Sequence, residues 1–381
     1  MTFEILNFSD ITIIYDKKRV PLSTMERNNR KGDFRYYGAQ GVIDYVDDYI
    51  FDGKYLLIAE DGENLKSKKQ NIAQIAEGKF WVNNHAHIVQ CNNKCRIEYL
   101  CFLLNSMDLS GYITGSAQPK LSQTNLNHIQ LKIPPIEIQD LILERILPLE
   151  RKIAINTAIN ENLEQQAQAI LKNYMDSYDY KLVPLSTIAE VIDCLHSKKP
   201  EQIKSGNRQL LQLENIKDDG FLDLTYKYLI SESDYQNWIR KCEIHEGDCV
   251  ITNVGRIGAV AQAPRDTHVA MGRNMTCIRL KQEYKLQAYF ITVLLSDHMR
   301  KEIQYNTDEG TIMGSLNVKN IPKLQFPFFD SEKMISLEQV LFSLRKQFEE
   351  NYLQNQLLSA LRDTLLPKLM NGEINVSGIQ I

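Results

Sequence analysis

One short stretch of the chain gathers side chains that could bind a nucleobase or a metal ion: Asn83, Asn84, His85 and His87. Asparagine can form a bidentate pair with adenine in the major groove. If the stretch is a strand, His85 and His87 lie on one face, where two imidazoles could begin a metal site. No cysteine or carboxylate is spaced to complete that site, so we predict no metal here. We expect these side chains to hydrogen-bond to backbone turns or to DNA.

Basic residues occur in local clusters, although the net charge of the chain is −4. A nucleic-acid surface needs a basic face rather than a basic total. Phosphate contacts from such clusters would position a protein on a duplex without reading its sequence, and the alternative is ordinary solvated surface. The candidate contacts are Arg30 and Lys31; Lys66, Lys68 and Lys69; Lys198 and Lys199; and Arg273 with Asn274.

Three further residues are candidates for contact with DNA. Asn253 and Arg256 follow a β-like run and flank Gly255, so a loop tip there could enter a groove. Arginine with guanine is the commonest specific base contact. Tyr36 either packs against the DNA backbone or fills the domain core.

The cysteines indicate an intracellular, reduced protein. Seven cysteines, an odd number without a paired CxxC pattern, fit free thiols in the cytoplasm. Cys91, Cys95 and Cys101 could suggest zinc, but their spacing fits small buried hydrophobic residues better. The first residues lack a signal-peptide pattern, and no apolar run approaches the length of a membrane span, so we expect a cytoplasmic protein without a membrane partner.

An internal repeat supplies the elements that must carry these residues. Residues 20–24 (VPLST) recur letter for letter at 183–187, which we interpret as one shared anchor. Leu121, Asn125 and Gln130 recur as Leu316, Asn320 and Gln325, all displaced by 195 positions. The repeat predicts two tandem, related domains of mixed α/β (α+β) class, each followed by a helical spacer. The predicted bounds are 1–134, 135–172, 173–327 and 328–381.

Both spacers repeat apolar residues at alternating steps of 3 and 4, which is a heptad seam. So narrow a seam needs a partner, and the other copy is the obvious one, in an antiparallel, pseudo-twofold coiled coil. Asn156 and Asn160, matched by Asn351 and Asn355, interrupt the seams near their middles. Polar groups in a seam fix register at a cost in stability, so we hypothesise that these four mark the crossing centre. The alternative is that they face water.

Prolines lead us to expect interruptions in both helices. Pro148 stands inside the first heptad pattern, where it removes a hydrogen-bond donor, so we expect a kink or a break into two helices. The second helix is expected to end near Pro367 and Asn371-Gly372.

Several stretches, in their two-copy order, resemble the specificity subunits of type I restriction-modification systems. They are residues 36–39, 57–62, 78–87, 133–139, 161–167, 247–258 and 361–372. The resemblance covers nearly the whole chain. At the start of the second helix, Phe328-Phe329-Asp330 replaces the Pro-Pro step of the family, which leaves the first residue of that helix open.

The resemblance implies a non-catalytic DNA reader. In this family each target-recognition domain reads one half of a split sequence, and the helices separate the domains and dock two methyltransferase subunits. Two motor-nuclease subunits complete the restriction enzyme. The methyltransferase modifies adenine N6 with S-adenosylmethionine, so that cofactor and ATP belong to the partners and this chain is expected to hold none.

Missing motifs agree with that expectation. Ile133-Pro134-Pro135-Ile136 lacks the polar and aromatic flanks of an adenine methyltransferase motif, and no Gly-x-x-x-x-Gly-Lys loop for ATP is present. We therefore predict a sequence-specific DNA-binding subunit without catalytic residues. Two alternatives remain: a two-domain scaffold that binds proteins, which the charge of −4 mildly favours, and the reader of a single-chain restriction-modification enzyme.

Overall fold

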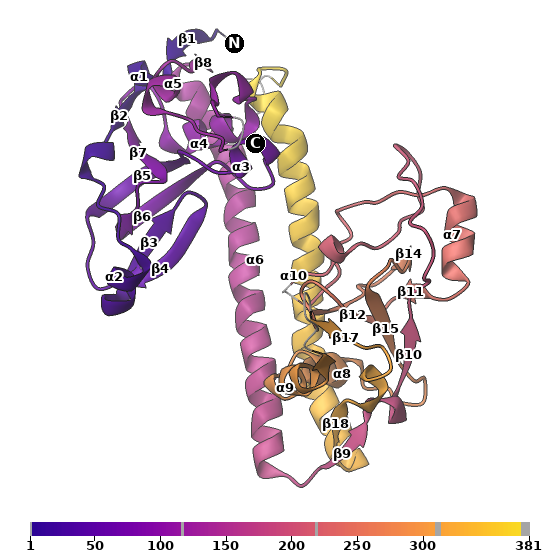
Figure 1. The fold of residues 1–381 in the computed structure, drawn as a ribbon. Helices are drawn as coiled ribbons and strands as arrows, with labels where there is room; N and C mark the ends of the chain where they lie inside the picture. The colour runs from indigo at the N-terminus through magenta and orange to yellow at the C-terminus, as the bar shows by residue number, and fades with distance from the viewer. Residues whose placement is uncertain (1, 116–117, 218–219, 309–313, 375–381) are drawn as a thin grey trace. The chain divides into compact units, whose positions relative to one another are not determined.

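The computed structural model describes residues 2–115, 118–217, 220–308 and 314–374 (Figure 1). The chain divides into two units. The first unit contains residues 1–152 and 358–381, and the second contains residues 153–357. Within the described residues, no helix combines the length and the apolar character that crossing a membrane requires.

The first unit is built on a six-stranded sheet in the order β2-β7-β5-β6-β3-β4 (Figure 1). Its strands are β2 (Thr12–Ile14), β3 (Lys31–Gly38), β4 (Gly41–Val46), β5 (Phe51–Ala59), β6 (Ala73–Val82) and β7 (Ala86–Cys91). All neighbours are antiparallel except β3 and β6, which run parallel. Leu56 and Ile58 of β5 face one core, and Tyr55 and Leu57 face another. The central strands are therefore covered on both faces, which explains their nearly continuous apolar sequence.

Short elements complete this unit. They are β1 (Glu4–Asn7), α1 (Phe8–Ile11), η1 (Asp16–Lys18), α2 (Thr24–Asn29), α3 (Asn64–Ser67), α4 (Ile97–Ser106), η2 (Ser110–Tyr112), α5 (Gln123–Asn127) and β8 (Gln130–Ile133). Cys95 lies in a hydrophobic core and Cys91 and Cys101 pack against it, as small hydrophobic residues do.

The second unit has a four-stranded sheet in the order β10-β15-β12-β13. Its strands are β10 (Ala189–Asp193), β12 (Cys249–Thr252), β13 (Val260–Gln262) and β15 (Met275–Leu280). The remaining strands form pairs, namely β9 (Lys181–Pro184) with β18 (Gln325–Phe328), β11 (Glu243–His245) with β14 (His268–Ala270), and β16 (Thr307–Asp308) with β17 (Ser315–Leu316). Its short helices are η3 (Leu185–Thr187), η4 (Leu213–Asn215), α7 (Glu232–Ile239), α8 (Gln287–Leu294), α9 (Asp297–Tyr305) and η5 (Ile321–Lys323).

The structure confirms the echo of residues 121–130 at 316–325 and contradicts the echo of residues 20–24 at 183–187. β8 pairs with β1 in the first unit, as β18 pairs with β9 in the second, and Gln130 and Gln325 open the equivalent strands. In those pairs, Asn7 faces Gln130 and Pro184 faces Gln325, so Pro184 corresponds to Asn7 rather than to Pro21. The VPLST echo is therefore not structurally equivalent. Pro-Leu-Ser is a general turn and cap signal: Ser23 caps α2, whereas Pro184 leads into a 3-10 turn.

Two long helices run through the units: α6 (Ile136–Ser177) and α10 (Ser331–Met370). Of the kink or break expected at Pro148, the break does not occur, because Pro148 lies inside α6. Packing on both sides of the proline outweighs the lost hydrogen bond: Ile142 and Ile146 are buried in the core of the first unit, and Ala167 and Leu171 in that of the second. The first spacer was predicted to end at residue 172, but α6 continues to Ser177.

The structure shows where the second long helix begins, which the Phe328-Phe329-Asp330 sequence had left open. The helix begins at Ser331, and the Asp330 carboxylate accepts a hydrogen bond from the Lys333 amide at 3.0 Å, as an N-cap does. The helix continues past Pro367 to Met370 and ends directly before Asn371-Gly372, which confirms the predicted end. Leu369 and Met370 are buried in the first unit's core, which explains the extension.

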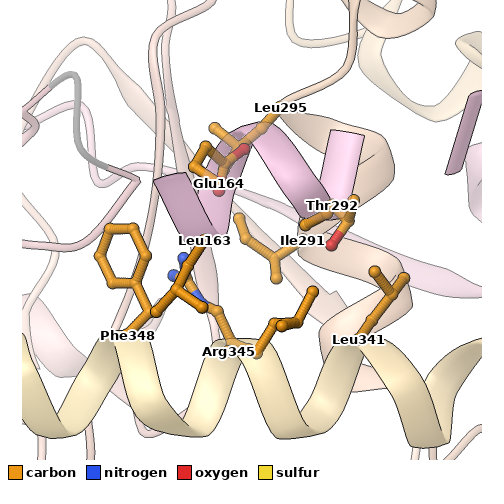
Figure 2. Close-up of a pocket in the computed structure, with 10 residues that line it drawn as sticks. Leu163, Glu164, Ile291, Thr292, Leu295, Leu341, Arg345 and Phe348 are labelled. Carbon is orange, nitrogen blue, oxygen red and sulfur yellow. The ribbon is translucent and has the colours of Figure 1, made fainter. Parts of the chain in front are cut away.

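Within each unit, segments of α6 and α10 pack against each other in antiparallel fashion. In the second unit Asn160 bonds to Asn351, and Asn156, one turn earlier, bonds to Asn355, one turn later. Figure 2 shows Leu341, Arg345 and Phe348 along one face of α10, directed toward Leu163 and Ile291, around a cavity of about 10 Å³. That space holds about one water molecule, so this contact is closely packed.

Candidate nucleic-acid interface

Three of the candidate contacts in the first unit are buried, which favours core packing for Tyr36 and hydrogen bonds within the protein for Asn83 and His87. Tyr36 is fully buried, and its hydroxyl accepts a hydrogen bond from the Leu22 amide at 2.9 Å. Asn83 is 8% exposed and accepts a hydrogen bond from the His85 amide. His87 is 1% exposed because β7 lies between β2 and β5, where its side chains face the interior. These residues shape the scaffold and do not offer a surface to DNA.

His87 belongs to a buried ionic network, which the sequence did not indicate. Its Nδ1 lies 2.6 Å from Asp16 Oδ2, and its Nε2 donates to the Leu121 carbonyl at 2.8 Å. Arg19 Nη1 lies 2.6 Å from Glu60 Oε2, and Lys120 Nζ lies 3.2 Å from Oε1 of the same carboxylate. Contrary to our expectation, two carboxylates thus stand beside His87, but cationic nitrogens already contact them.

The network holds both carboxyl groups in the ionised form. Burial acts to raise the pKa of Asp16, but the hydrogen bond and charge of His87, the Ile88 amide and the charge of Arg19 together lower it. Burial likewise acts to raise the pKa of Glu60, and Arg19, His87 and Lys120 outweigh it and lower the pKa. The network joins β5, β7 and η1 to the segment before α5, so it positions loops around it.

His85 and Asn84 are exposed at the end of this network. His85 Nδ1 lies 2.7 Å from Asp61 Oδ2, and the ring is 48% exposed. The Asn84 side chain is exposed, while its carbonyl accepts a hydrogen bond from Arg19 Nη1 at 3.2 Å. Both side chains can therefore still reach a ligand from outside.

The basic residues near α2 already have acidic partners. Arg30 Nε lies 2.9 Å from Asp47 Oδ1, and its guanidinium lies over the Trp81 ring at 4.8 Å. Lys31 Nζ lies 2.7 Å from Asp44, and bonds from Lys31, the Tyr45 amide and Arg27 lower the pKa of that carboxyl to about 2. A DNA phosphate would have to compete with these carboxylates.

The lysines around α3 form an exposed basic strip on the first unit. Lys66 lies in α3, and Lys68 and Lys69 follow it. Lys68 adopts a left-handed backbone with φ of 49°, and its Nζ donates to the Met107 carbonyl at 3.0 Å. All three side chains are exposed, as phosphate contacts require.

In the second unit, three predicted residues meet at one cavity of about 370 Å³. It is lined by Lys199, Leu210, Gln212, Leu213, Glu214, Trp238, Arg273 and Asn274. We call this the second-unit cavity. Lys199, Arg273 and Asn274 were predicted from the sequence, and the structure brings them together although some 70 positions separate them. Lys198, beside them in sequence, is exposed.

The backbone around Arg273 and Asn274 is closely constrained. Asn274 has φ of +63°, a left-handed conformation that asparagine tolerates better than most residues. A Cβ on Gly272 would lie 1.8 Å from the Leu211 carbonyl oxygen, so only glycine fits there. The Asn253 amide donates to the Asn274 carbonyl at 2.9 Å.

Asn253 itself is a buried support rather than a contact, which corrects our prediction. It is 8% exposed, its Nδ2 donates to the Leu316 carbonyl, and its Oδ1 accepts from the Thr276 hydroxyl. Arg256 is exposed as expected, and its Nη1 donates to the Ile216 carbonyl at 3.0 Å.

The cavity combines the polar groups that read bases and bind phosphates. Lys199 Nζ lies 3.9 Å from the centre of the Tyr228 ring, and within the described residues the exposed Arg273 side chain forms no ion pair. Arginine suits guanine or phosphate, asparagine and glutamine suit adenine, and a carboxylate such as Glu214 can accept from cytosine. The cavity size is typical of a ligand site.

Sequence reasoning missed Gln212, Glu214 and Trp238. Gln212-Leu213-Glu214 alternates polar and apolar residues, which was a signal for outward-facing polar side chains. Trp238 is 2% exposed and packs with Leu210 and Ala270 beneath the cavity.

The four helix asparagines converge in the second unit. Asn351 Nδ2 donates to Asn160 Oδ1 at 2.9 Å, and Asn156 Nδ2 donates to Asn355 Oδ1 at 2.9 Å. Asn160 Nδ2 also donates to the Phe348 carbonyl at 3.0 Å. Asn156 is fully buried and Asn160 and Asn351 nearly so, which excludes the water-facing alternative for these three. Their role in fixing register stays a prediction.

Fold and site together define a two-unit α/β protein with paired long helices and a polar cavity, and comparison with known proteins places it further. Residues 2–165 match the type I restriction modification DNA specificity domain. The chain is 24% identical over 346 residues to a Haemophilus influenzae protein assigned as a type I restriction enzyme specificity subunit, covering 86% of this chain and 84% of that protein. The HindI specificity subunit of the same organism is 20% identical, with 84% of each chain covered.

A solved structure shows the same fold. The crystal structure of the S subunit of a type I restriction-modification system from M. genitalium matches with a TM-score of 0.58 and 12% identity, covering 97% of this chain and 96% of that one. The similarity to type I restriction-modification specificity subunits therefore extends over most of this chain.

Proposed function

We propose that this chain reads a bipartite DNA sequence and directs a partner adenine-N6 methyltransferase and restriction endonuclease to it. Each α/β domain reads one half of the sequence. The match to a DNA specificity domain supports the role in DNA specificity within a restriction-modification complex. The residues that line the second-unit cavity support the assignment of a DNA contact to particular side chains. The chain is a non-catalytic subunit.

The cavity supports a division of labour between affinity and specificity. Lys199 and Arg273 supply positive charge for phosphates, which accounts for most non-sequence-specific affinity. Gln212, Glu214 and Asn274 present groups that distinguish base edges. In the first unit, Lys66, Lys68 and Lys69 supply the exposed charge, with His85 and Asn84 as candidates for further contacts.

The partners in this proposal are two methyltransferase subunits and two motor-nuclease subunits, which hold S-adenosylmethionine and ATP, in the cytoplasm. Apolar side chains on the helices of the second unit support docking of a protein. Ile155 and Ile159 of α6 are 55% and 40% exposed, and Leu357 of α10 is 72% exposed. They flank the asparagine contacts, where exposed isoleucine and leucine on paired helices suit a protein partner.

The test is co-expression with a partner methyltransferase in a host without other N6-adenine methylation, followed by sequencing that detects N6-methyladenine. The proposal expects a split motif that disappears when this chain is deleted. With Arg273→Ala, one half of the motif should relax while the other half stays intact, because only the second domain is altered. The matched control is Arg300→Ala, whose side chain is 72% exposed and pairs with Asp297 in the same unit.

Binding to duplex DNA of that motif separates the reader from a protein scaffold. The affinity should fall steeply with salt, since each neutralised phosphate releases counterions. Lys199→Ala should lower the salt slope by about 1 with little change in motif. Stable co-purification with the methyltransferase, but no methylated motif and no salt-dependent DNA binding, would favour the scaffold.

A further inference from the structure

Two histidines and one glutamate meet on the paired strands β11 and β14 of the second unit. His245 and His268 are direct partners in the antiparallel register. Glu243 stands two residues before His245, so the two side chains lie on the same face of β11. The side chains of Glu243, His245 and His268 are 26%, 43% and 65% exposed, which leaves the cluster open to solvent.

The spacing of the ligand atoms suits a small metal ion. His245 Nε2 lies 3.2 Å from Glu243 Oε2, and His268 Nδ1 lies 3.8 Å from Glu243 Oε1. All three ligand atoms lie within 4.8 Å of one another. Ligands at roughly 2.1 Å from zinc in a tetrahedral site are separated by about 3.4 Å. We propose that Glu243, His245 and His268 form a binding site for Zn²⁺ or a similar divalent transition metal.

Groups around the cluster support this site. The Tyr235 hydroxyl donates to Glu243 Oε1 at 2.6 Å, which orients the carboxylate as outer hydrogen bonds do in metal sites. Arg279 is nearby, but its charge is balanced by Asp248, which is 4% exposed, with Nη2 and Oδ2 2.5 Å apart.

Metal binding at His245 would remove one contact of Arg279. Its Nη2 lies 3.3 Å from His245 Nδ1, and metal binding at Nε2 places the proton of the neutral ring on Nδ1. That contact is then lost. It is the longest polar contact of Arg279, which keeps Asp248 and the Glu243 carbonyl, 2.7 Å away.

Two other groups of potential ligands fit a metal less well. In the cluster of Asp16, Glu60 and His87, the nitrogens of Arg19 and Lys120 already contact Glu60. In the cluster of Asp193, Cys194 and His196, burial raises the pKa of the Cys194 thiol, whereas metal binding requires the thiolate.

The site would connect to the second-unit cavity through β14. This strand ends at Ala270, which packs with Leu210 and Trp238, and Arg273 follows shortly after. A metal that joins His268 to β11 would therefore stiffen the strand that leads to Arg273. Metal binding itself does not depend on the DNA-reading role.

The experiment is calorimetric titration of the metal-free full chain with Zn²⁺, in complex with its methyltransferase partner if solubility requires it. Co²⁺ absorption spectra in the visible range report the ligand geometry. We expect the unmodified chain to bind one Zn²⁺. The affinity for Zn²⁺ should fall at least 10-fold in His268→Ala and in His245→Ala, and about 10-fold in Tyr235→Phe. His196→Ala is the matched control, because His196 is 69% exposed and also lies beside a carboxylate.

Circular dichroism verifies that each variant is folded, and His268→Gln replaces His268→Ala if the latter is not. Unchanged Zn²⁺ affinity in a folded His268 variant, or no binding by the unmodified chain, overturns the proposal. A methylated motif without zinc binding would reject the metal site alone, and zinc binding without a motif would reject the DNA-reading role alone.

Discussion

The two domains use similar polar residues in opposite ways. In the first unit, His87 and Asp16 form a pair whose side chains are 1% and 5% exposed, inside a network that joins the strands to nearby loops. In the second unit, His196 and Asp193 form a pair with 69% and 29% exposure. Arg30 of the first unit is bound to Asp47, whereas Arg273 of the second lines an open cavity.

The difference teaches that a polar residue type does not decide between scaffold and ligand contact. What decides is whether the chain itself supplies partners for its donors and acceptors. A buried polar group needs them, because an unpaired group costs free energy. An exposed group without them remains available to a ligand.

The largest effect expected from this comparison is on stability. Asp16→Ala removes the carboxylate that contacts the buried Nδ1 of His87 and accepts from the Ile88 amide, so the free energy of unfolding should fall by about 3–5 kcal/mol. Asp193→Ala, at the exposed pair, should cost under about 1 kcal/mol. Urea denaturation followed by circular dichroism compares the two. Equal losses would remove the distinction between the domains.

The helix asparagines should show a large single effect that a double change reverses. Asn160→Leu leaves Asn351 Nδ2 without its acceptor and the Phe348 carbonyl without its donor, at a cost of about 1–3 kcal/mol. Asn160→Leu with Asn351→Leu replaces both partners by apolar groups and should recover most of that loss, at the expense of register. A double-mutant cycle measures the coupling, and purely additive costs would contradict it.

A smaller effect concerns DNA binding. Arg273→Ala should weaken binding to the target duplex by about 10- to 100-fold with little change in melting temperature, because its side chain lines the cavity and is exposed. Arg30→Ala should weaken binding less, because Asp47 already occupies that guanidinium. Fluorescence anisotropy at fixed salt gives both affinities. An Arg30 effect as large as that of Arg273 would mean that DNA displaces the carboxylate.

The smallest effect is a dependence of stability on acidic pH. The pKa values of Asp16 and Glu60 are lowered in the folded protein from ordinary values of 3.8 and 4.5. Their contribution to stability is therefore complete above those values and is lost as the pH falls below about 4 through the folded pKa values. Unfolding curves from pH 7 to 3 measure this, and the loss should be smaller in Asp16→Ala.

Long-range pattern made the helices and several strands predictable. The heptad seams of 135–172 and 328–381 contain enough periodic residues to indicate α6 and α10. The break considered at Pro148 does not occur, because tertiary packing on either side outweighs the local cost of the proline. Residues 375–381 of the predicted second spacer lie outside the described residues.

The site was only partly predictable. His87 and Tyr36 were left open between contact with DNA and a place inside the protein, because residue type does not reveal that β7 and β3 lie inside a sheet. Lys199 and Arg273 were selected as basic residues, but nothing local connects them to Gln212 or Trp238. That assembly depends on chain segments brought together by the fold.

The division of the chain also bears on the order in which it folds during synthesis. The second unit is continuous, residues 153–357, whereas the first needs residues from 358 onward, including the buried Leu369 and Met370. A ribosome therefore synthesises every residue of the second unit before it has made the last part of the first. The half that is begun first is completed last, and a premature stop codon after residue 357 should spare the second unit while depriving the first of part of its core.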